Sequence, residues 1–258
     1  MGRDFTVLYN ERIAWRGFFN FYRDLILHID TFKEIKTLCE IGISGGGKQA
    51  EWCRQFPAAT VIGIDIFHPE TVTANDPPYM GFPTIELGNA AWQRTYDCYS
   101  ESIELQKKFN NMNLFHGYDG YAVNTRDMII SKFSKLDILI DDGSVNWEDT
   151  MNTWGIWKDA IADNGIFISE TPDGNGTSEW IAMTKQQHID NMNWLAKEHR
   201  QIIFDFGPYK IINPDISPWE DDMDFSANYL AIGCHDYKHY MPVIEKYSDC
   251  IVAGKENI

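Results

Sequence analysis

Acidic side chains follow two apolar runs of the sequence, at positions where they could hold a cation. Asp141 and Asp142 come directly after residues 136–140, and Glu170 comes directly after residues 165–169. Adjacent carboxylates cannot both be buried without partners, because each would carry a large desolvation cost. They need a cation, a set of hydrogen-bond donors or water. If the two runs are neighbouring parallel strands, about 5 Å apart, Asp142 and Glu170 can share a hard cation such as Mg²⁺, which prefers oxygen ligands.

A glycine-rich turn follows an earlier apolar run, residues 37–42. Residues 40–47 read EIGISGGG and lead into a helix-like stretch at residues 48–56. Glycines at such a turn let the backbone bend tightly and approach a ligand without a Cβ clash. The next apolar run leads to Asp65, whose carboxylate can accept hydrogen bonds from both hydroxyls of a ribose. Because ligands of doubly wound sheets lie at the carboxyl ends of the strands, this pattern indicates a nucleoside-containing cofactor.

Two cofactor classes fit this turn. A dinucleotide favours the pattern G-x-G-x-x-G, whose middle glycine admits the pyrophosphate. Here Gly42 and Gly47 match the outer positions, but Ser44 stands in the middle. S-adenosylmethionine carries no phosphate, so Glu40, just ahead of the turn, can face its cationic portion. A Rossmann-like fold whose turn binds no ligand is the structural alternative.

Two segments carry a family resemblance. Residues 39–46, CEIGISGG, resemble the first motif of the class I S-adenosylmethionine-dependent methyltransferases, and residues 63–66, GIDI, resemble the second. The resemblance implies that the glycine turn surrounds the methionine part of the cofactor and that the carboxylate of Asp65 binds the ribose. It places the end of the third strand near the adenine, where Asp119 can accept a hydrogen bond from the adenine amino group; an ordinary solvated turn is the alternative. The full set of predicted cofactor-binding residues is Glu40, Gly42, Ser44, Gly45, Asp65, Asp119 and Asp141.

The acidic segments resemble the sugar O-methyltransferases of macrolide biosynthesis. The fourth motif of those enzymes reads Asp-Asp-Gly-Ser-His and their fifth strand ends in Glu-Asp, whereas residues 141–145 read DDGSV here and residues 170–171 read ET. The resemblance implies that Asp142 and Glu170 are metal ligands, with Mg²⁺ as the metal. The chain departs from the pattern at Val145, where the family has its expected base, and at Thr171, where the family has a carboxylate.

Methyl transfer to oxygen needs an acceptor hydroxyl that loses its proton as it attacks. With Val145 at the motif position, Asp142, His116 and His68 are candidates for the base by position alone. We predict Asp142 and His116 as catalytic residues. Asp142 is the better placed, because it follows the strand end expected nearest the transferred methyl group. A structural role for either histidine stays open.

Strand-like and helix-like stretches alternate along the chain. Most strand-like runs are nearly continuous in apolar residues, as in strands buried on both faces of a parallel sheet. These runs cover residues 37–42, 60–66, 112–116, 136–140, 165–169, 201–206 and 228–233. Helices are expected at residues 11–30, 48–56, 86–110, 123–133 and 148–162, the last of them stopped by the sequence DNG at residues 163–165. The order predicts an α/β fold: a doubly wound, Rossmann-like, mostly parallel seven-stranded sheet with helices on both faces. We expect one methyltransferase domain, residues 1–258, with a helical N-terminal extension over about residues 1–35.

Composition and charge limit the classes of partner that we expect this chain to bind. The 258 residues include 38 acidic and 22 Lys or Arg side chains, a net charge of −16. A surface this acidic repels phosphate backbones, so we expect no nucleic-acid partner. We also expect no membrane-spanning helix and no signal peptide. The five cysteines include no C-x-x-C pair, which favours a cytoplasmic protein without zinc or disulfides.

The prediction is methyl transfer from S-adenosylmethionine to a small hydroxylated molecule, by O-methylation. The alternatives are a nicotinamide-dependent or other reaction on the same fold, and a non-catalytic protein that keeps cofactor affinity. Residues 67–86, which are rich in proline, form a long loop that is either a lid or a plain surface loop. The N-terminal helix either covers the sheet or pairs with a second copy of the chain in a homo-oligomer.

Overall fold

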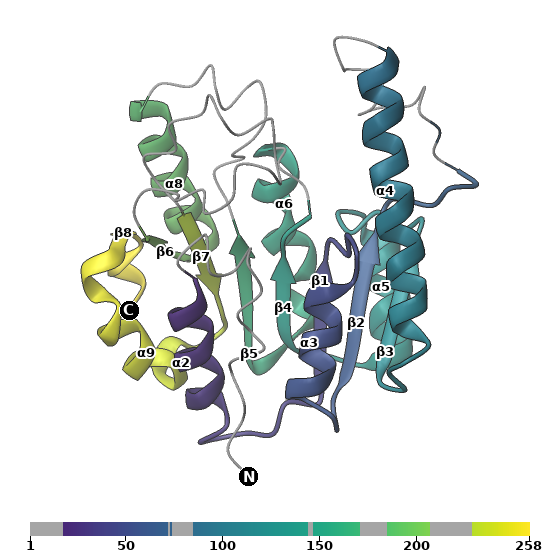
Figure 1. The fold of residues 1–258 in the computed structure, drawn as a ribbon. Coiled ribbons are helices and arrows are strands. Elements are labelled where there is room, and N and C mark those ends of the chain that lie inside the picture. Colours follow the sequence, from purple (N-terminus) through teal and green to yellow (C-terminus); the bar gives the residue numbers. More distant parts are fainter. Residues whose placement is uncertain (1–17, 72, 74–84, 144–146, 171–184, 207–228) are drawn as a thin grey trace.

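A computed structural model describes residues 18–71, 73, 85–143, 147–170, 185–206 and 229–258. One mixed sheet of eight strands runs through this part of the chain, in the order β3-β2-β1-β4-β5-β7-β6-β8. The strands are β1 (Thr37–Ile41), β2 (Thr60–Asp65), β3 (Met112–His116), β4 (Leu136–Asp141), β5 (Ile161–Glu170), β6 (Ile202–Asp205), β7 (Tyr229–Gly233) and β8 (Ile251–Ala253). Strands β1 to β5 are parallel, and β7 lies antiparallel between β5 and β6. The predicted doubly wound α/β class is therefore confirmed (Figure 1).

The strand order reverses between β1 and β4. From β1 the chain proceeds through β2 to β3 on one side, and β4 continues to β5 on the other. The crevice outside the carboxyl ends of the strands at such a reversal is where ligands bind in open α/β sheets. The glycine turn leaves β1 at this point, and the acidic pair leaves β4 beside it.

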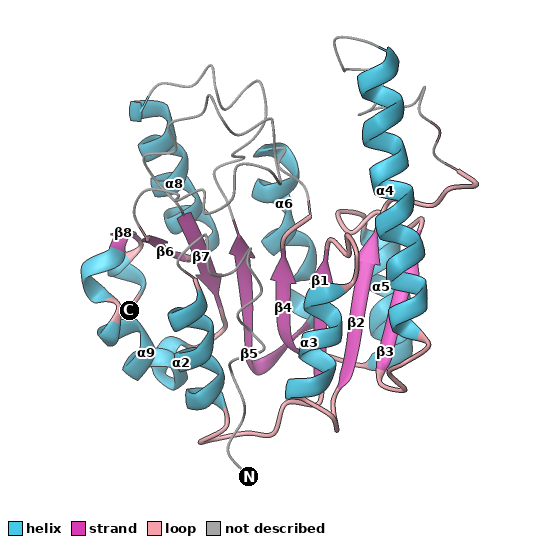
Figure 2. Cartoon of the chain, in the orientation of Figure 1, coloured by secondary structure: helices cyan, strands magenta, loops and turns pink. Residues whose placement is uncertain are grey.

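Helices cover both faces of the sheet, in three layers (Figure 2). They are α2 (Phe19–Ile29), α3 (Gly47–Gln55), α4 (Ile85–Gln106), α5 (Val123–Phe133), α6 (Trp147–Trp157), α8 (Lys185–His199) and α9 (Met241–Lys246). Side chains of α2, α3 and α9 pack on one face with Leu38 and Val61, whereas α5 and α6 pack on the other with Cys39 and Ile62. Neighbouring strand residues thus point to opposite buried layers, which explains the continuous apolar runs of the sequence.

Helix α2 is the described part of the expected N-terminal helix, and it packs against the sheet. Phe21, Tyr22 and Leu25 are each at most 1% exposed. The ring of Phe21 lies 5.2 Å from that of Phe204 in β6. Of the two roles left open, covering the sheet is the one that this helix has here; pairing with a second copy stays a prediction.

Most element boundaries agree with the sequence, but the α6 region differs. The helix expected over residues 148–162 ends at Trp157, a 3₁₀ turn covers Lys158–Ala160, and β5 already begins at Ile161. The sequence DNG, predicted as a helix stop, therefore lies within a strand, where the register against β4 shifts. Strand β8 was not predicted either, because its three residues form a strand only by pairing with β6. None of the described helices is long and apolar enough to cross a membrane.

Candidate functional site

The turn after β1 is shaped by three residues with positive φ. Gly42, Ser44 and Gly46 have φ of 94°, 49° and 76°. A Cβ on Gly42 would lie 2.4 Å from the backbone oxygen of Asp142, so glycine is required where β1 and β4 approach. Ser44 takes a left-handed conformation that side chains seldom adopt, at the position where a dinucleotide site has glycine.

Asp65 holds this turn in place. Its Oδ2 accepts hydrogen bonds from the backbone N–H groups of Ile43, at 2.9 Å, and Ser44, at 3.3 Å. Its Oδ1 accepts a third from the N–H of Phe67, at 2.8 Å. A carboxylate has about four lone-pair directions, so these three bonds fix the side chain and leave capacity for a ligand. The predicted ribose contact of Asp65 stays a prediction.

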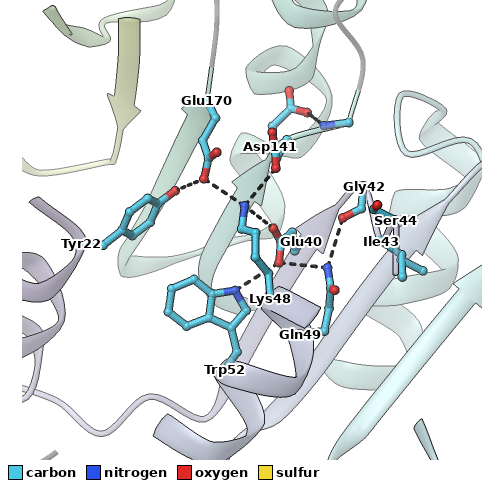
Figure 3. Close-up of polar contacts among 12 residues, drawn as sticks. Tyr22, Glu40, Gly42, Ile43, Ser44, Lys48, Gln49, Trp52, Asp141 and Glu170 are labelled. Atoms are coloured by element: carbon cyan, nitrogen blue, oxygen red, sulfur yellow. Dashed lines mark hydrogen bonds and ion pairs between the residues drawn. The ribbon is translucent and has the colours of Figure 1, made fainter. Parts of the chain in front are cut away.

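Glu40 lies beneath the turn and is fully buried (Figure 3). Its Oε1 is 2.6 Å from the Nζ of Lys48, and its Oε2 accepts hydrogen bonds from Gln49, at 3.0 Å, and from the indole of Trp52, at 3.1 Å. Burial raises the pKa of Glu40 to about 7, against the opposing effect of the Lys48 ammonium. Both carboxylate oxygens are engaged by α3, so the contact of Glu40 with the cofactor stays a prediction.

Lys48 brings the two acidic segments together. Its Nζ lies 3.0 Å from Asp142 Oδ2 and 3.0 Å from Glu170 Oε1, in addition to its contact with Glu40. The Tyr22 hydroxyl of α2 donates a 2.7 Å hydrogen bond to the same Glu170 oxygen (Figure 3). Burial disfavours the charged ammonium, but the three carboxylates outweigh it and raise the pKa of Lys48. The site is thus an internal ion cluster at the ends of β1, β4 and β5.

Asp141 has a different environment from its neighbour Asp142. It is 2% exposed, and its Oδ1 accepts a 2.7 Å hydrogen bond from the Tyr121 hydroxyl. Burial raises the pKa of Asp141 to about 6, although the hydroxyls of Tyr121 and Thr153 stabilise the charged form. Asp141 is therefore held on the side of the sheet away from Lys48, and its cofactor role stays a prediction.

The end of β3 forms a separate group. The Nε2 of His116 lies 3.0 Å from the Ser102 hydroxyl of α4, and the ring packs edge-on against Tyr99 with centroids 4.6 Å apart. Burial lowers the pKa of His116. Asp119 is exposed, and one of its oxygens accepts the N–H of Tyr121 at 2.8 Å. Asp119 is accessible to a ligand, as an adenine contact requires.

The structure does not bring the two predicted catalytic residues together. Strands β2 and β1 lie between β3, which carries His116, and β4, which leads to Asp142. At the usual spacing, three strand intervals amount to about 14 Å. His116 and Asp142 therefore cannot act on the same proton, and the packing of His116 against α4 favours its structural role. His68, the third candidate, lies near Tyr99 in the same group, with ring centroids 5.6 Å apart.

Asp142 and Glu170, the predicted metal ligands, lie close together, but both contact the Lys48 ammonium. Asp142 and Glu170 converge as expected for neighbouring strands, and Lys48 lies between them. No three His, Cys, Asp or Glu side chains within the described residues are arranged to hold a metal ion. With Lys48 in place, these residues do not fit a divalent cation, and Mg²⁺ stays a prediction from the resemblance. The departures at Val145 and Thr171, and most of the loop at residues 67–86, lie outside the described residues.

Sequence reasoning missed Lys48 and the three side chains that complete the cluster, namely Tyr22, Gln49 and Trp52. One signal could have found Lys48. A lysine in the first turn of a helix faces the positive end of the helix dipole and is unfavourable there without an anionic partner. The carboxylates that needed a cation supply that partner.

Comparisons with known proteins found similar solved structures but no matching family. A scan against protein-family models found no match, and a search of curated proteins found none. The chain is similar to the solved structure of the MycE methyltransferase from the mycinamycin biosynthetic pathway in complex with Mg, SAH and mycinamycin VI, at 14% identity and a TM-score of 0.44, covering 86% of this chain and 50% of MycE. It is also similar to the SAH-bound Podospora anserina methyltransferase PaMTH1 (12% identity, TM-score 0.45, 84% and 79% covered) and to the fibrillarin/Nop5p complex (8%, 0.44, 83% and 82%).

This chain spans about half the length of MycE. TM-scores below 0.5 establish no activity, and the fold class rests on the strand order and register given above.

Proposed function

We propose that the chain is an S-adenosylmethionine-dependent methyltransferase that methylates a hydroxyl group of a small molecule. The observation that carries the proposal is the turn at the reversal of strand order, shaped by Gly42 and tied to the end of β2 by Asp65. The crevice outside this turn is the place where open α/β sheets bind nucleoside cofactors. In this proposal Gly42, Ser44 and Gly45 border the methionine part, and Asp65 and Asp119 take the ribose and the adenine.

The charge of the site supports a sulfonium donor over a dinucleotide. Three carboxylates surround one ammonium, so the cluster carries about two negative charges when all are ionised and about one when Glu40 is protonated. This net negative charge beneath the turn attracts a cationic sulfonium and repels a pyrophosphate. Ser44, with its side chain at the middle position of the turn, also leaves less room for a pyrophosphate than glycine would.

The chain's own contribution to the reaction is to hold the acceptor in line and to take its proton. The donor, when bound, supplies an electrophilic methyl group. The side chain of Asp142 is 15% exposed at the end of β4, beside the turn. We assign it as the base: as the acceptor oxygen forms its bond to the methyl carbon, the bond between that carbon and the donor sulfur would break, S-adenosylhomocysteine would leave as a neutral thioether, and the acceptor proton would pass to the Asp142 carboxylate. Lys48 holds that carboxylate in position from below. The net charge of −16 favours a small-molecule acceptor over a nucleic acid.

Calorimetric titration with S-adenosylmethionine and S-adenosylhomocysteine tests the proposal. We expect saturable binding that Asp65→Ala weakens by about tenfold or more, the scale of a lost hydrogen bond to a charged group. Asp137→Ala is the matched control. Asp137 also accepts backbone N–H bonds, from Lys36 and Thr37, and pairs with Lys33, but it lies at the opposite end of the sheet. Its replacement removes comparable bonds and should leave donor affinity unchanged.

Other outcomes separate the alternatives. A folded protein that binds neither compound contradicts the proposal. Stabilisation by NAD⁺ in place of the sulfonium compounds would favour nicotinamide chemistry. Donor binding without transfer of a labelled methyl group to any of a panel of sugars and phenols would favour a non-catalytic protein.

A further inference from the structure

The ion cluster at the ends of β1, β4 and β5 has a lysine where a metal ion could sit. The Nζ of Lys48 lies within 3.0 Å of oxygens from Glu40, Asp142 and Glu170. Its side chain is 9% exposed, and those of Glu40 and Glu170 are 0% and 3% exposed. This ammonium is therefore shielded from water and surrounded by anionic oxygen, the environment that otherwise suits a hard cation.

The rest of the fold holds Lys48 in this position. Helix α3 begins at Gly47, one residue before Lys48, and is anchored on the sheet by Ala50, Trp52 and Cys53, each at most 2% exposed. Gln49 donates hydrogen bonds both to Glu40 and to the backbone oxygen of Gly42, which ties the first turn of the helix to the glycine turn. The ammonium therefore cannot leave the carboxylates by a shift of the helix alone.

A divalent cation and this ammonium exclude each other. An ion bound to Asp142 and Glu170 would lie about 2.0–2.6 Å from their oxygens, in the space around the Lys48 Nζ that contacts both at 3.0 Å. Two positive centres would then face each other within a few ångströms. Glu40 does not offer the ion another binding position. One of its oxygens contacts Lys48, and the other accepts hydrogen bonds from Gln49 and Trp52.

We propose that the Lys48 ammonium is the resident cation of this site, replacing a divalent metal ion between Asp142 and Glu170. The cation is then part of the chain: it does not exchange with solvent and is not removed by chelators. It joins the ends of three strands, and through Glu170 it also joins Tyr22 of α2. Lys48 is a positioning residue, since it acts through the carboxylates. The inference does not depend on the proposed methyl transfer, because the ion is tested without any donor.

Titration of Mn²⁺ followed by EPR tests this inference on the full chain at about pH 8, above the pKa of about 7 that Glu40 has beside Lys48. We expect no specific Mn²⁺ site in the unmodified protein, and the same spectra from the double variant Asp142→Asn/Glu170→Gln. Lys48→Ala removes the ammonium and leaves three carboxylates around open space. It should gain Mn²⁺ affinity by about tenfold or more, the scale on which single side chains change metal affinity, and its thermal midpoint should rise with Mn²⁺.

Lys33→Ala is the matched control. Lys33 is also buried, at 8% exposure, but it pairs with a single carboxylate, Asp137, at 2.7 Å. Its removal should create no Mn²⁺ site. Mn²⁺ binding by the unmodified protein that is lost in the double variant would overturn the inference. A folded Lys48→Ala variant that binds no Mn²⁺ would also overturn it. If that variant does not fold, the comparison of the unmodified protein with the double variant decides alone.

Discussion

Replacing Lys48 with methionine should destabilise the protein strongly, because it leaves three carboxylates without their common cation. Lys48 is 9% exposed and contacts Glu40, Asp142 and Glu170 at 2.6–3.0 Å. Breaking a buried ion pair by removing one partner costs about 3–5 kcal/mol, since the remaining charge stays buried. Methionine keeps an apolar side chain of similar length, so the loss of stability measures the effect of the missing charge and not that of a cavity.

The loss of stability should depend on pH, because the carboxylates that lose the ammonium can take up protons. The pKa of Glu40 is already about 7, and the Lys48 ammonium holds it down. Without the ammonium this pKa rises further, so the folded variant binds a proton that the unfolded chain releases. The stability of the variant therefore falls as pH increases, and the loss relative to the unmodified protein should be smaller at about pH 6 than at about pH 8.

Urea unfolding of four proteins measures the effect: the unmodified chain, Lys48→Met, Glu40→Gln and the double variant. Neutralising Glu40 should restore part of the stability lost with Lys48, giving a coupling free energy of at least about 1 kcal/mol. Lys107→Met serves as a surface control, because its partner Glu104 is largely exposed and the pair should contribute little. If Lys48→Met lost no more than about 1 kcal/mol of stability at both pH values, as for a surface pair, Lys48 would not be the cation that stabilises these buried carboxylates.

Three further predictions concern the surroundings of the cluster. Gly42→Ala should destabilise by about 2–5 kcal/mol in urea unfolding, because its Cβ would lie 2.4 Å from the backbone oxygen of Asp142, which directly follows β4. Gly155→Ala, in the exposed middle of α6, should instead stabilise by about 1 kcal/mol, because among the described residues outside its own helix the new Cβ would meet no atom closer than 4.0 Å. Equal effects of the two changes would contradict the strain inferred at Gly42. Tyr22→Phe should cost about 1–3 kcal/mol through its lost 2.7 Å bond to the carboxylate ending β5, and an unchanged urea midpoint would argue against that bond. Asp141→Asn should flatten the pH dependence of stability: burial raises the pKa of Asp141 from 3.8 to about 6, so its contribution is present at low pH and is lost as pH rises through this window. Between low pH and pH values above 6, the free energies of unfolding of the two proteins should diverge by about 3 kcal/mol in total. Parallel curves for the two proteins would show that Asp141 titrates normally.

The pattern of the sheet could be predicted because its rules are local. Strands buried on both faces must be apolar throughout, so β1 and β4 stand out as runs. The edge strand β3 is only partly buried and gives a weaker run, but it begins and ends at the residues expected. The turn could be predicted for the same reason, since Gly42 has a φ of 94° that favours glycine in any context. The register shift in β5 and the strand β8 could not, because both arise from pairing with distant segments.

The sequence by itself thus determined most of the elements, the tight turn after β1 and the need of the acidic segments for a positive partner. Only the tertiary structure decided that this partner is Lys48. The three carboxylates come from β1, β4 and β5, and they meet at one ammonium because β4 lies between the other two strands. Charge interactions depend on distance in space, and the order of strands in a sheet, which sets those distances, is decided by packing of the whole chain.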